Sequence, residues 1–218
     1  MKQIDTQRPD LRQILGKITP LSASFQQRLQ EQLLTENFPQ RHFVLRPGEI
    51  ARRIYFIRQG FLRAFSIDRN GRQTTSRFFS QGELMTCIHS FFNQQPSEEY
   101  IEVLKASTVQ SLSWNKLNSF YADFPETNLV GRILLQKHYT QSEKHHIMMR
   151  MFNPVDRYQA LLSLYPKIEQ QTTQTNIASY LGLSRETLSR MKSRLIRARQ
   201  NLNAPSSSVN QPALQAGK

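Results

Sequence analysis

Hydrophobic residues recur along the chain with spacings that change twice, and the changes mark three regions. In the first region, residues 14–38, Leu21, Phe25, Leu29 and Leu33 stand four positions apart. This spacing places apolar side chains on one face of a helix. We therefore predict an amphipathic helix in this segment.

The second region begins at Arg41 and has the pattern of β-structure. Its apolar runs are short and rich in β-branched and aromatic residues. Pro47-Gly48, Gln59-Gly60 and Asn70-Gly71 separate them as turns. Asn-Gly favours a type I′ hairpin, because both residues tolerate a positive φ. The pattern predicts a closed or sandwiched antiparallel unit, with strands in the segments 42–49, 52–68, 72–79, 100–106 and 108–114.

The third region is helical and begins with one long helix. Pro125 suits a first helical turn, and the next proline is Pro154, so a helix of about 27 residues and roughly 40 Å fits between them. Such a helix needs a partner surface. We predict that a second copy of the chain supplies it; the alternative is packing on its own β-unit alone. The apolar stripe of this helix turns polar at its centre, at Lys137, Thr140, Gln141 and Lys144.

The composition narrows the function. The 218 residues include 29 Lys and Arg against 16 Asp and Glu, a net charge of +13, which points to a polyanionic partner. The single cysteine, Cys87, excludes an intramolecular disulfide. No apolar run reaches the roughly 20 residues of a membrane span, and the N-terminus lacks a signal-peptide core. We expect a cytoplasmic protein with no membrane partner. We see neither a catalytic pair nor a set of metal ligands, so we predict no enzyme and no metal site.

Residues 175–195 carry the strongest local signal. Thr175 can cap a first helix, Gly182 can supply the left-handed conformation of a tight turn, and Ser184 can cap a second helix. Leu188, Met191 and Leu195 share one side of the second helix. The opposite side is polar and consists of Arg185, Glu186, Ser189, Arg190 and Ser193.

The polar side of this second helix suits DNA. Arg can bond guanine bidentately and Glu can accept from the cytosine amino group, so Arg185, Glu186 and Arg190 can read base edges in the major groove. The alternative is a solvated face with a Glu186–Arg190 ion pair. DNA binding accounts better than a solvated face for the glycine turn, the two helix caps and the separation of apolar and polar faces together. Further cations can neutralise phosphates: Lys192, Arg194, Arg197 and Arg199.

The stretch TNIASYLGLSRETLSRMKSRL, residues 175–195, resembles the helix-turn-helix of the Crp-Fnr superfamily of bacterial transcription factors, with its Ser-Arg-Glu-Thr core at 184–187. LRPGEIARRIYFIRQGFLRAF and FFSQGEL resemble the β-roll of the family's cyclic-nucleotide-binding domain. The resemblance implies an α+β fold with an antiparallel β-roll sensor domain flanked by helices at 1–122, a dimerisation helix at 123–152 and a winged helix-turn-helix domain at 153–202. The composition of 203–218 predicts a disordered tail. After Leu195 there is no hairpin signal, so we expect the wing to be reduced or absent.

The resemblance also implies a function, that of a homodimeric, sequence-specific transcription regulator with double-stranded DNA and RNA polymerase as partners. The alternative is a ligand-binding or interaction protein that uses the β-roll without sequence-specific DNA binding. The residues expected to contact DNA are Thr175, Ser184, Arg185, Glu186, Thr187, Ser189, Arg190, Lys192 and Arg194.

The chain departs from the family's ligand-binding pattern. In members that bind cyclic AMP, a Gly-Glu-Leu turn is followed by an Arg-Ser pair that grips the phosphate. Here Ser97 and Glu98 stand at the positions of that pair. We therefore predict no cofactor and no response to cyclic AMP. An unidentified polar or anionic effector between Glu83 and the long helix is a hypothesis; the alternatives are a wet dimer seam or a collapsed pocket. Its candidate residues are Gly82, Glu83, Leu84, Ser97, Glu98, Gln141 and Ser142.

Overall fold

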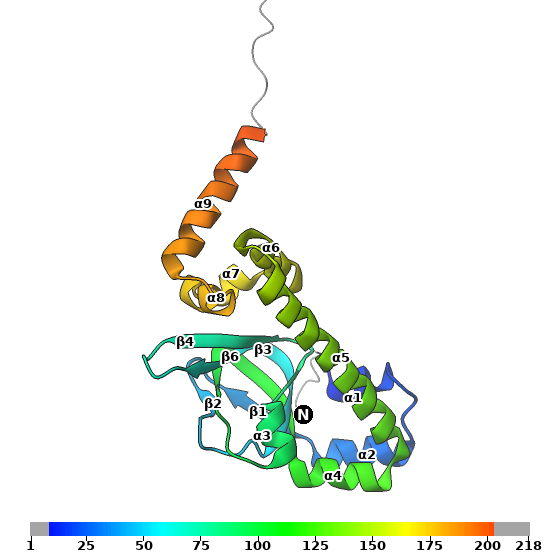
Figure 1. Ribbon diagram of the computed structural model, residues 1–218. Coiled ribbons are helices and arrows are strands. Elements are labelled where there is room, and N and C mark those ends of the chain that lie inside the picture. Colours follow the sequence, from blue (N-terminus) through cyan, green and yellow to red (C-terminus); the bar gives the residue numbers. More distant parts are fainter. Residues whose placement is uncertain (1–8, 203–218) are drawn as a thin grey trace, which may run out of the picture.

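Helices flank an antiparallel β-roll, and a long helix leads from the roll to a small helical unit (Figure 1). The computed structural model describes residues 9–202, with side chains as far as residue 198. The predicted tail, 203–218, lies outside the described residues. The α+β fold class is confirmed.

The roll is one antiparallel sheet of order β1-β6-β3-β4, in which β2 also pairs with β6 and β5 with β3. Its centre is the pair of long strands β3 and β6, which are paired from Arg53 opposite Ser113 to Phe65 opposite Tyr100, with register shifts between these ends. Apolar side chains from both strands fill the roll, and those of Ile57 and Val103 are completely buried. The strands are β1 (Leu34–Phe38), β2 (Phe43–Leu45), β3 (Arg53–Ile67), β4 (Gln73–Ser80), β5 (Leu84–Met85) and β6 (Tyr100–Ser113).

The single helix predicted for residues 14–38 is wrong in extent. The chain forms α1 (Leu11–Gly16), then α2 (Ala23–Gln32), whose N-cap Ser22 accepts a hydrogen bond from the Phe25 N–H. Phe25 and Leu29 are buried, as the four-residue spacing indicates. Residues 34–38 instead pair with β6 as strand β1. A partner strand more than 60 positions away in the chain overrides the local pattern.

Gln59-Gly60 is not a turn, and the segments 100–106 and 108–114 are not separate strands. β3 runs through Gly60 and β6 through Ser107, and the register between them shifts there. Gly60 has φ +122°, and a Cβ at this residue would lie 2.0 Å from the Ser107 Oγ. The glycine therefore lets two bent strands approach closely where a side chain would not fit.

The hairpin at Asn70-Gly71 is confirmed between β3 and β4, but its turn is not type I′. Of the two residues, Gly71 alone has positive φ, at +77°. The Gly71 N–H donates to the Asp68 carbonyl at 3.0 Å, and Asp68 Oδ1 accepts from the Asn70 and Arg72 N–H groups at 2.9 Å each. This is a type I turn closed by a glycine bulge.

The long helix α5 (Pro125–Met151) has the predicted 27 residues. Its predicted stripe divides between two environments. Val130 and Met148 are buried against the chain's own domains, whereas Ile147 and Met151 are 49% and 77% exposed. One edge of the helix therefore packs on its own chain, and a second edge remains open. The shorter helices α3 (Ile88–Asn93) and α4 (Trp114–Asp123) lie between β5 and α5 in the sequence.

The C-terminal unit packs directly on the roll. It consists of α6 (Pro154–Leu164), α7 (Ile168–Gln171), α8 (Gln174–Tyr180) and α9 (Arg185–Leu202). One hydrophobic core joins Phe61 and Phe78 of the roll to Leu161, Ile177 and Leu188 of this unit. Helix α9 continues to Leu202, and the residues after it lie outside the described part of the chain, so the expected lack of a wing stays a prediction.

A buried polar network crosses the same interface. Arg63 is 5% exposed and donates to Asn176 Oδ1 on α8 at 2.7 Å and to Glu102 Oε2 at 2.8 Å. The hydroxyls of Thr75 and Ser179 lie 2.7 Å apart. These contacts fix α8 against strand β4, so they also set how α9 is presented.

Candidate functional site

The helix-turn-helix formed by α8 and α9 begins two residues earlier than expected. Thr173, not Thr175, is the N-cap of α8, and its Oγ1 accepts from the Asn176 N–H at 3.2 Å. Thr175 lies exposed in the first turn. The sequence offers several threonines here, and Thr173 is the cap because its backbone is extended, with φ −78° and ψ 157°, directly before the first helical residue, Gln174.

The turn between the two helices has the predicted geometry. Gly182 adopts φ +68°. The Leu183 N–H donates to the Ala178 carbonyl at 2.9 Å, and the Gly182 N–H donates to the Ser179 carbonyl at 3.4 Å. This pair of bonds is a Schellman motif, which ends a helix at a left-handed glycine. Ser184 Oγ then accepts from the Thr187 N–H at 3.1 Å, which confirms the predicted cap of α9.

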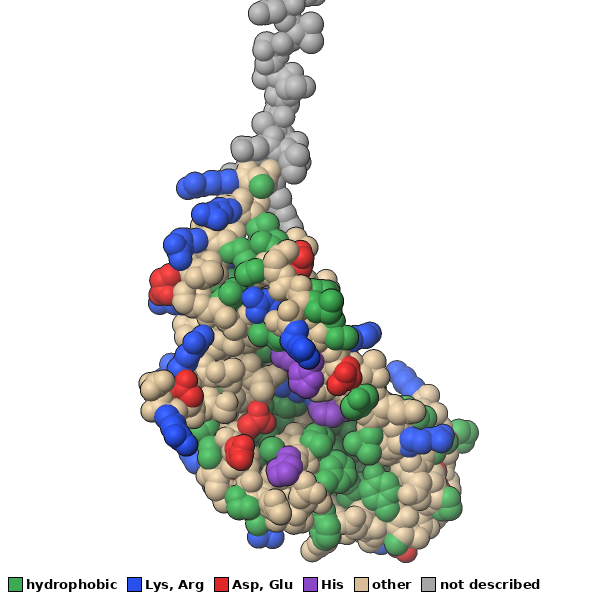
Figure 2. Space-filling view, in the orientation of Figure 1, with side chains coloured by type: hydrophobic (Ala, Val, Ile, Leu, Met, Phe, Trp, Pro, Cys, Tyr) green, Lys and Arg blue, Asp and Glu red, His purple; other side chains and the backbone are tan. Residues whose placement is uncertain are grey.

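Helix α9 has two distinct faces. Leu188 is fully buried and Met191 is 9% exposed within the core shared with α6 and α8. The opposite side lies at the edge of the molecule, and Figure 2 shows cationic side chains along it. Its exposed residues are Arg185, Glu186, Ser189, Arg190, Ser193, Arg194 and Arg197.

Glu186 is held in its charged form. Its own backbone N–H and the Ser184 hydroxyl, followed by Arg185 and Arg190, keep the pKa of its carboxyl below the usual range. The salt bridges formed within residues 9–202 do not include the alternative Glu186–Arg190 pair. The face therefore presents a carboxylate and guanidinium groups side by side, with no ion pair between Glu186 and Arg190.

Lys192 has a different environment from the exposed arginines of α9. It is half-buried and forms a salt bridge with Glu169 on α7, which also accepts a hydrogen bond from the Tyr158 hydroxyl at 2.6 Å. The Lys192 ammonium and then the Tyr158 hydroxyl lower the pKa of Glu169. Lys192 thus ties α9 to α7. Thr187 is also half-buried, and its Oγ1 accepts from the Ser184 hydroxyl at 3.1 Å.

The residues proposed for an effector pocket do not all come together. Gly82, Glu83, Leu84 and Gln141 line a cavity of about 390 Å³, whereas Ser97, Glu98 and Ser142 do not. The buried Ser97 hydroxyl donates to the Glu99 carbonyl at 2.9 Å and accepts from the Glu99 N–H at 3.0 Å. It therefore shapes the loop before β6.

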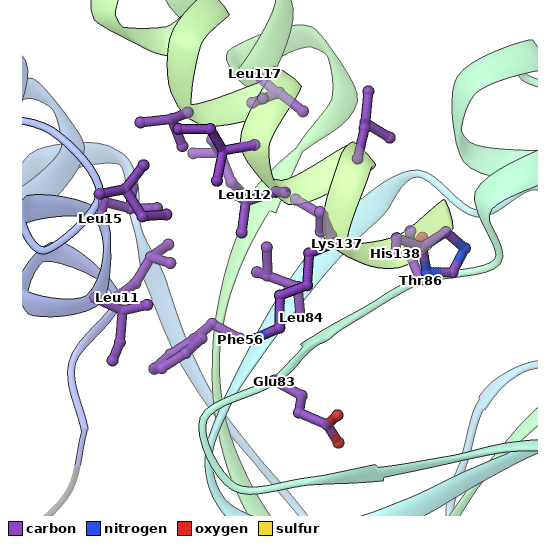
Figure 3. Close-up of a pocket in the computed structure, with 18 of the residues that line it drawn as sticks. Leu11, Leu15, Phe56, Glu83, Leu84, Thr86, Leu112, Leu117, Lys137 and His138 are labelled. Atoms are coloured by element: carbon purple, nitrogen blue, oxygen red, sulfur yellow. The ribbon is translucent and has the colours of Figure 1, made fainter. Parts of the chain in front are cut away.

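Glu83, a candidate residue of the effector pocket, already has hydrogen-bond donors within its own turn. Its carboxylate accepts from the Ser80 N–H at 2.6 Å and from the Ser80 hydroxyl at 3.0 Å. Figure 3 shows it turned away from the other labelled residues. The sequence reasoning missed Arg77 and the apolar walls supplied by α1 and α4. No local signal marks them, because their segments are far apart in the sequence.

Two further searches of the structure give simple results. Residues 9–202 contain no group of three or more His, Cys, Asp or Glu side chains placed to hold a metal ion. In the same part of the chain, every helix is too short or too polar to span a membrane.

Comparison with known proteins shows which families and solved structures this architecture resembles. Residues 35–124 match the cyclic nucleotide-binding domain family. No curated protein matches the chain in sequence. Among solved structures, FixK2 from Bradyrhizobium japonicum is similar with a TM-score of 0.67 and 16% identity, over 81% of this chain and 89% of that one.

Two further solved structures show the same likeness. The c-di-GMP responsive global regulator CLP of Xanthomonas campestris has a TM-score of 0.65 and 19% identity, over 82% of this chain and 93% of that one. The catabolite activator protein of Thermus thermophilus has a TM-score of 0.52 and 17% identity, over 85% of this chain and 88% of that one. Residues 35–124 therefore match a cyclic nucleotide-binding domain, and the chain as a whole shares its fold with these solved structures.

Proposed function

We propose that the protein is a sequence-specific, DNA-binding transcription regulator that acts as a homodimer in the cytoplasm. The observation that carries this proposal is the division of α9. Leu188 and Met191 anchor one face in the core, while Arg185, Glu186 and Arg190 are exposed on the other. Solved structures of the same fold include a catabolite activator protein and a global regulator of gene expression.

The chemistry of the exposed face fits the major groove. A guanidinium group bonds bidentately to the O6 and N7 atoms of guanine, and a carboxylate accepts from the amino group of cytosine. Arg194 and Arg197 are exposed farther along α9 and can neutralise phosphates. Lys192 acts differently: its bond to Glu169 orients α9, so we assign it a positioning role.

The open edge of α5 supports dimerisation. Ile147, Met151 and Tyr139 are large apolar or aromatic residues that are 49%, 77% and 66% exposed. Such residues along one helix favour association with a second copy about a two-fold axis. Two α9 helices related by that axis would read half-sites about one helical turn apart. We further propose that the DNA-bound dimer acts on RNA polymerase.

We also propose that cyclic AMP is not the effector. Ser97 and Glu98 stand where family members carry the phosphate-gripping pair, and neither lines the cavity beside α5. The Glu83 carboxylate already accepts two hydrogen bonds from Ser80. Without a guanidinium fork, a charge-assisted bond of about 1.5–3 kcal/mol is lost. A calorimetric titration is expected to detect no binding of cyclic AMP at micromolar concentration.

The experiment that tests the function begins by selecting DNA fragments from a random pool with the purified protein. Fluorescence anisotropy then measures the affinity of the selected duplex at a fixed salt concentration. The variant Arg185→Ala, Arg190→Ala should bind at least about thirtyfold more weakly, because each bidentate contact contributes about 1–3 kcal/mol.

A matched control removes two exposed arginines from the β-roll. The variant Arg46→Ala, Arg52→Ala loses the same charge outside α9 and should keep nearly the full affinity for the selected sequence. If both double variants bind DNA as the wild type does, α9 does not read DNA. The protein would then be a ligand-binding or interaction protein that uses the β-roll alone.

A further inference from the structure

The cavity beside α5 is apolar over most of its surface. It has a volume of about 390 Å³ and lies between α1, α4, α5 and strands β3 and β6 (Figure 3). This size is within the range of about 300–1,000 Å³ that is typical of small-molecule sites. Its walls include Leu11, Leu15, Phe56, Leu112 and Leu117.

Two lysines, Lys17 and Lys137, are among the residues that line this cavity. Lys137 lines the cavity, and Figure 3 shows its side chain running from α5 toward Phe56 and Leu84. Within residues 9–202 its ammonium group has neither a hydrogen bond nor an ion pair. Lys137 is an exposed residue, so the cavity is open to solvent beside it. An anion that carries its own apolar surface can pair with this ammonium group while its tail covers the apolar walls.

The other polar groups at this end already have partners. Arg77 donates from Nη1 to His138 Nδ1 and from Nη2 to Gln141 Oε1 at 3.4 Å. Burial, and then the Arg77 charge, lower the pKa of His138, so its ring is neutral near pH 7. The acidic residue of the lining, Glu83, accepts from Ser80 and points away. Lys137 and Arg77 therefore give this end of the cavity a positive potential.

We propose that the cavity binds an unbranched aliphatic carboxylate, with its chain among the leucines of α1 and α4 and its carboxylate on Lys137. This inference rests on the proposed function only in that the ligand would be the regulator's effector. It narrows the polar or anionic effector that was one hypothesis from the sequence, because an apolar wall favours an alkyl chain and leaves the hydroxyls of a nucleotide without partners.

Calorimetry on the full-length protein, stripped of lipid on a hydrophobic resin, tests the proposal with octanoate, decanoate and dodecanoate. Each added methylene should lower Kd about fourfold, in keeping with the burial of a CH₂ group. Decanol, which has the same chain without the charge, should bind at least about tenfold more weakly than decanoate.

Three variants locate the ligand. Lys137→Met should weaken decanoate binding at least about tenfold, whereas Lys144→Met removes an exposed charge from the same helix outside the cavity and should change nothing. Ile14→Trp adds bulk at a half-buried wall residue and should abolish binding of dodecanoate first. Circular dichroism checks that each variant is folded.

Four results would overturn the proposal. These are no binding of any carboxylate, equal Kd values for decanoate and decanol, equal loss in the two lysine variants, and conversion of a dimer to a monomer by decanoate in light scattering. The last result would identify a second copy of the chain as the occupant. The selected DNA separates this test from the proposed function: DNA binding without carboxylate binding overturns the ligand alone, and the reverse overturns the regulator alone.

Discussion

The buried network around Arg63 should contribute strongly to the stability of the docked arrangement. Replacing Arg63 by Met keeps the apolar length of the side chain but removes its bonds to Glu102, Asn176 and Thr75. Breaking a buried ion pair typically costs about 3–5 kcal/mol. Glu102 retains 17% exposure of its side chain, so water can solvate it in part, and we expect the lower end, about 3 kcal/mol.

Urea denaturation followed by far-UV circular dichroism measures this loss. A change of about 3 kcal/mol should also lower Tm by roughly 6–12 °C in a chain of this size. The control Arg69→Met removes an exposed arginine from the β3–β4 hairpin and should change the free energy of unfolding by less than about 0.5 kcal/mol.

A double-mutant cycle asks whether the network joins the roll to α8. Arg63→Met and Asn176→Ala should be non-additive by about 1 kcal/mol or more, because their side chains bond directly at 2.7 Å. Additive effects, or an Arg63→Met variant within about 0.5 kcal/mol of the wild type, would refute the conclusion that this contact holds the helix-turn-helix in place.

Two other predictions concern stability. Burial lowers the pKa of both His138 and His145. The charge of Arg77 lowers the pKa of His138 further, and His146 does the same for His145. The unfolded chain therefore binds more protons than the folded chain, so the free energy of unfolding should fall as pH drops from about 7.5 to 5.5. In urea titrations, the double variant His138→Gln, His145→Gln should show a smaller dependence of this free energy on pH. An unchanged dependence would contradict the prediction. Gly60→Ala should lower the free energy of unfolding by about 2–6 kcal/mol through backbone strain and a clash with Ser107. Gly48 has φ +86° and open space around it, so Gly48→Ala should lower it by about 1–3 kcal/mol through strain alone. Equal losses of stability in thermal unfolding would show that the clash does not contribute.

Several elements could be predicted from the sequence because their causes are local. Ser184 caps α9 and Gly182 ends α8 through hydrogen bonds that span a few residues. Pro125 and Pro154 limit α5 to the predicted length because a proline cannot continue a helix past its first turn. The burial of Leu188 against the exposure of Arg185 and Arg190 follows from helical periodicity alone.

Other features depended on segments that meet only in the folded chain. Residues 34–38 became a strand because β6 pairs with them, and Gly60 became a bulge because Ser107 lies opposite. Lys192, predicted as a phosphate contact, is paired with Glu169 instead. In each case the deciding partner is distant in sequence, so the local pattern is consistent with more than one outcome.

The sequence by itself determined the fold class, the long helix and the two-faced helix α9, since periodicity, caps and breakers act within a few residues. Tertiary structure alone decided that the helix-turn-helix rests on the roll through Arg63 and Asn176, and that the pocket beside α5 is apolar around Lys137. Docked surfaces and cavities are assembled from residues of several separate elements, so their chemistry is set by packing and not by any one segment.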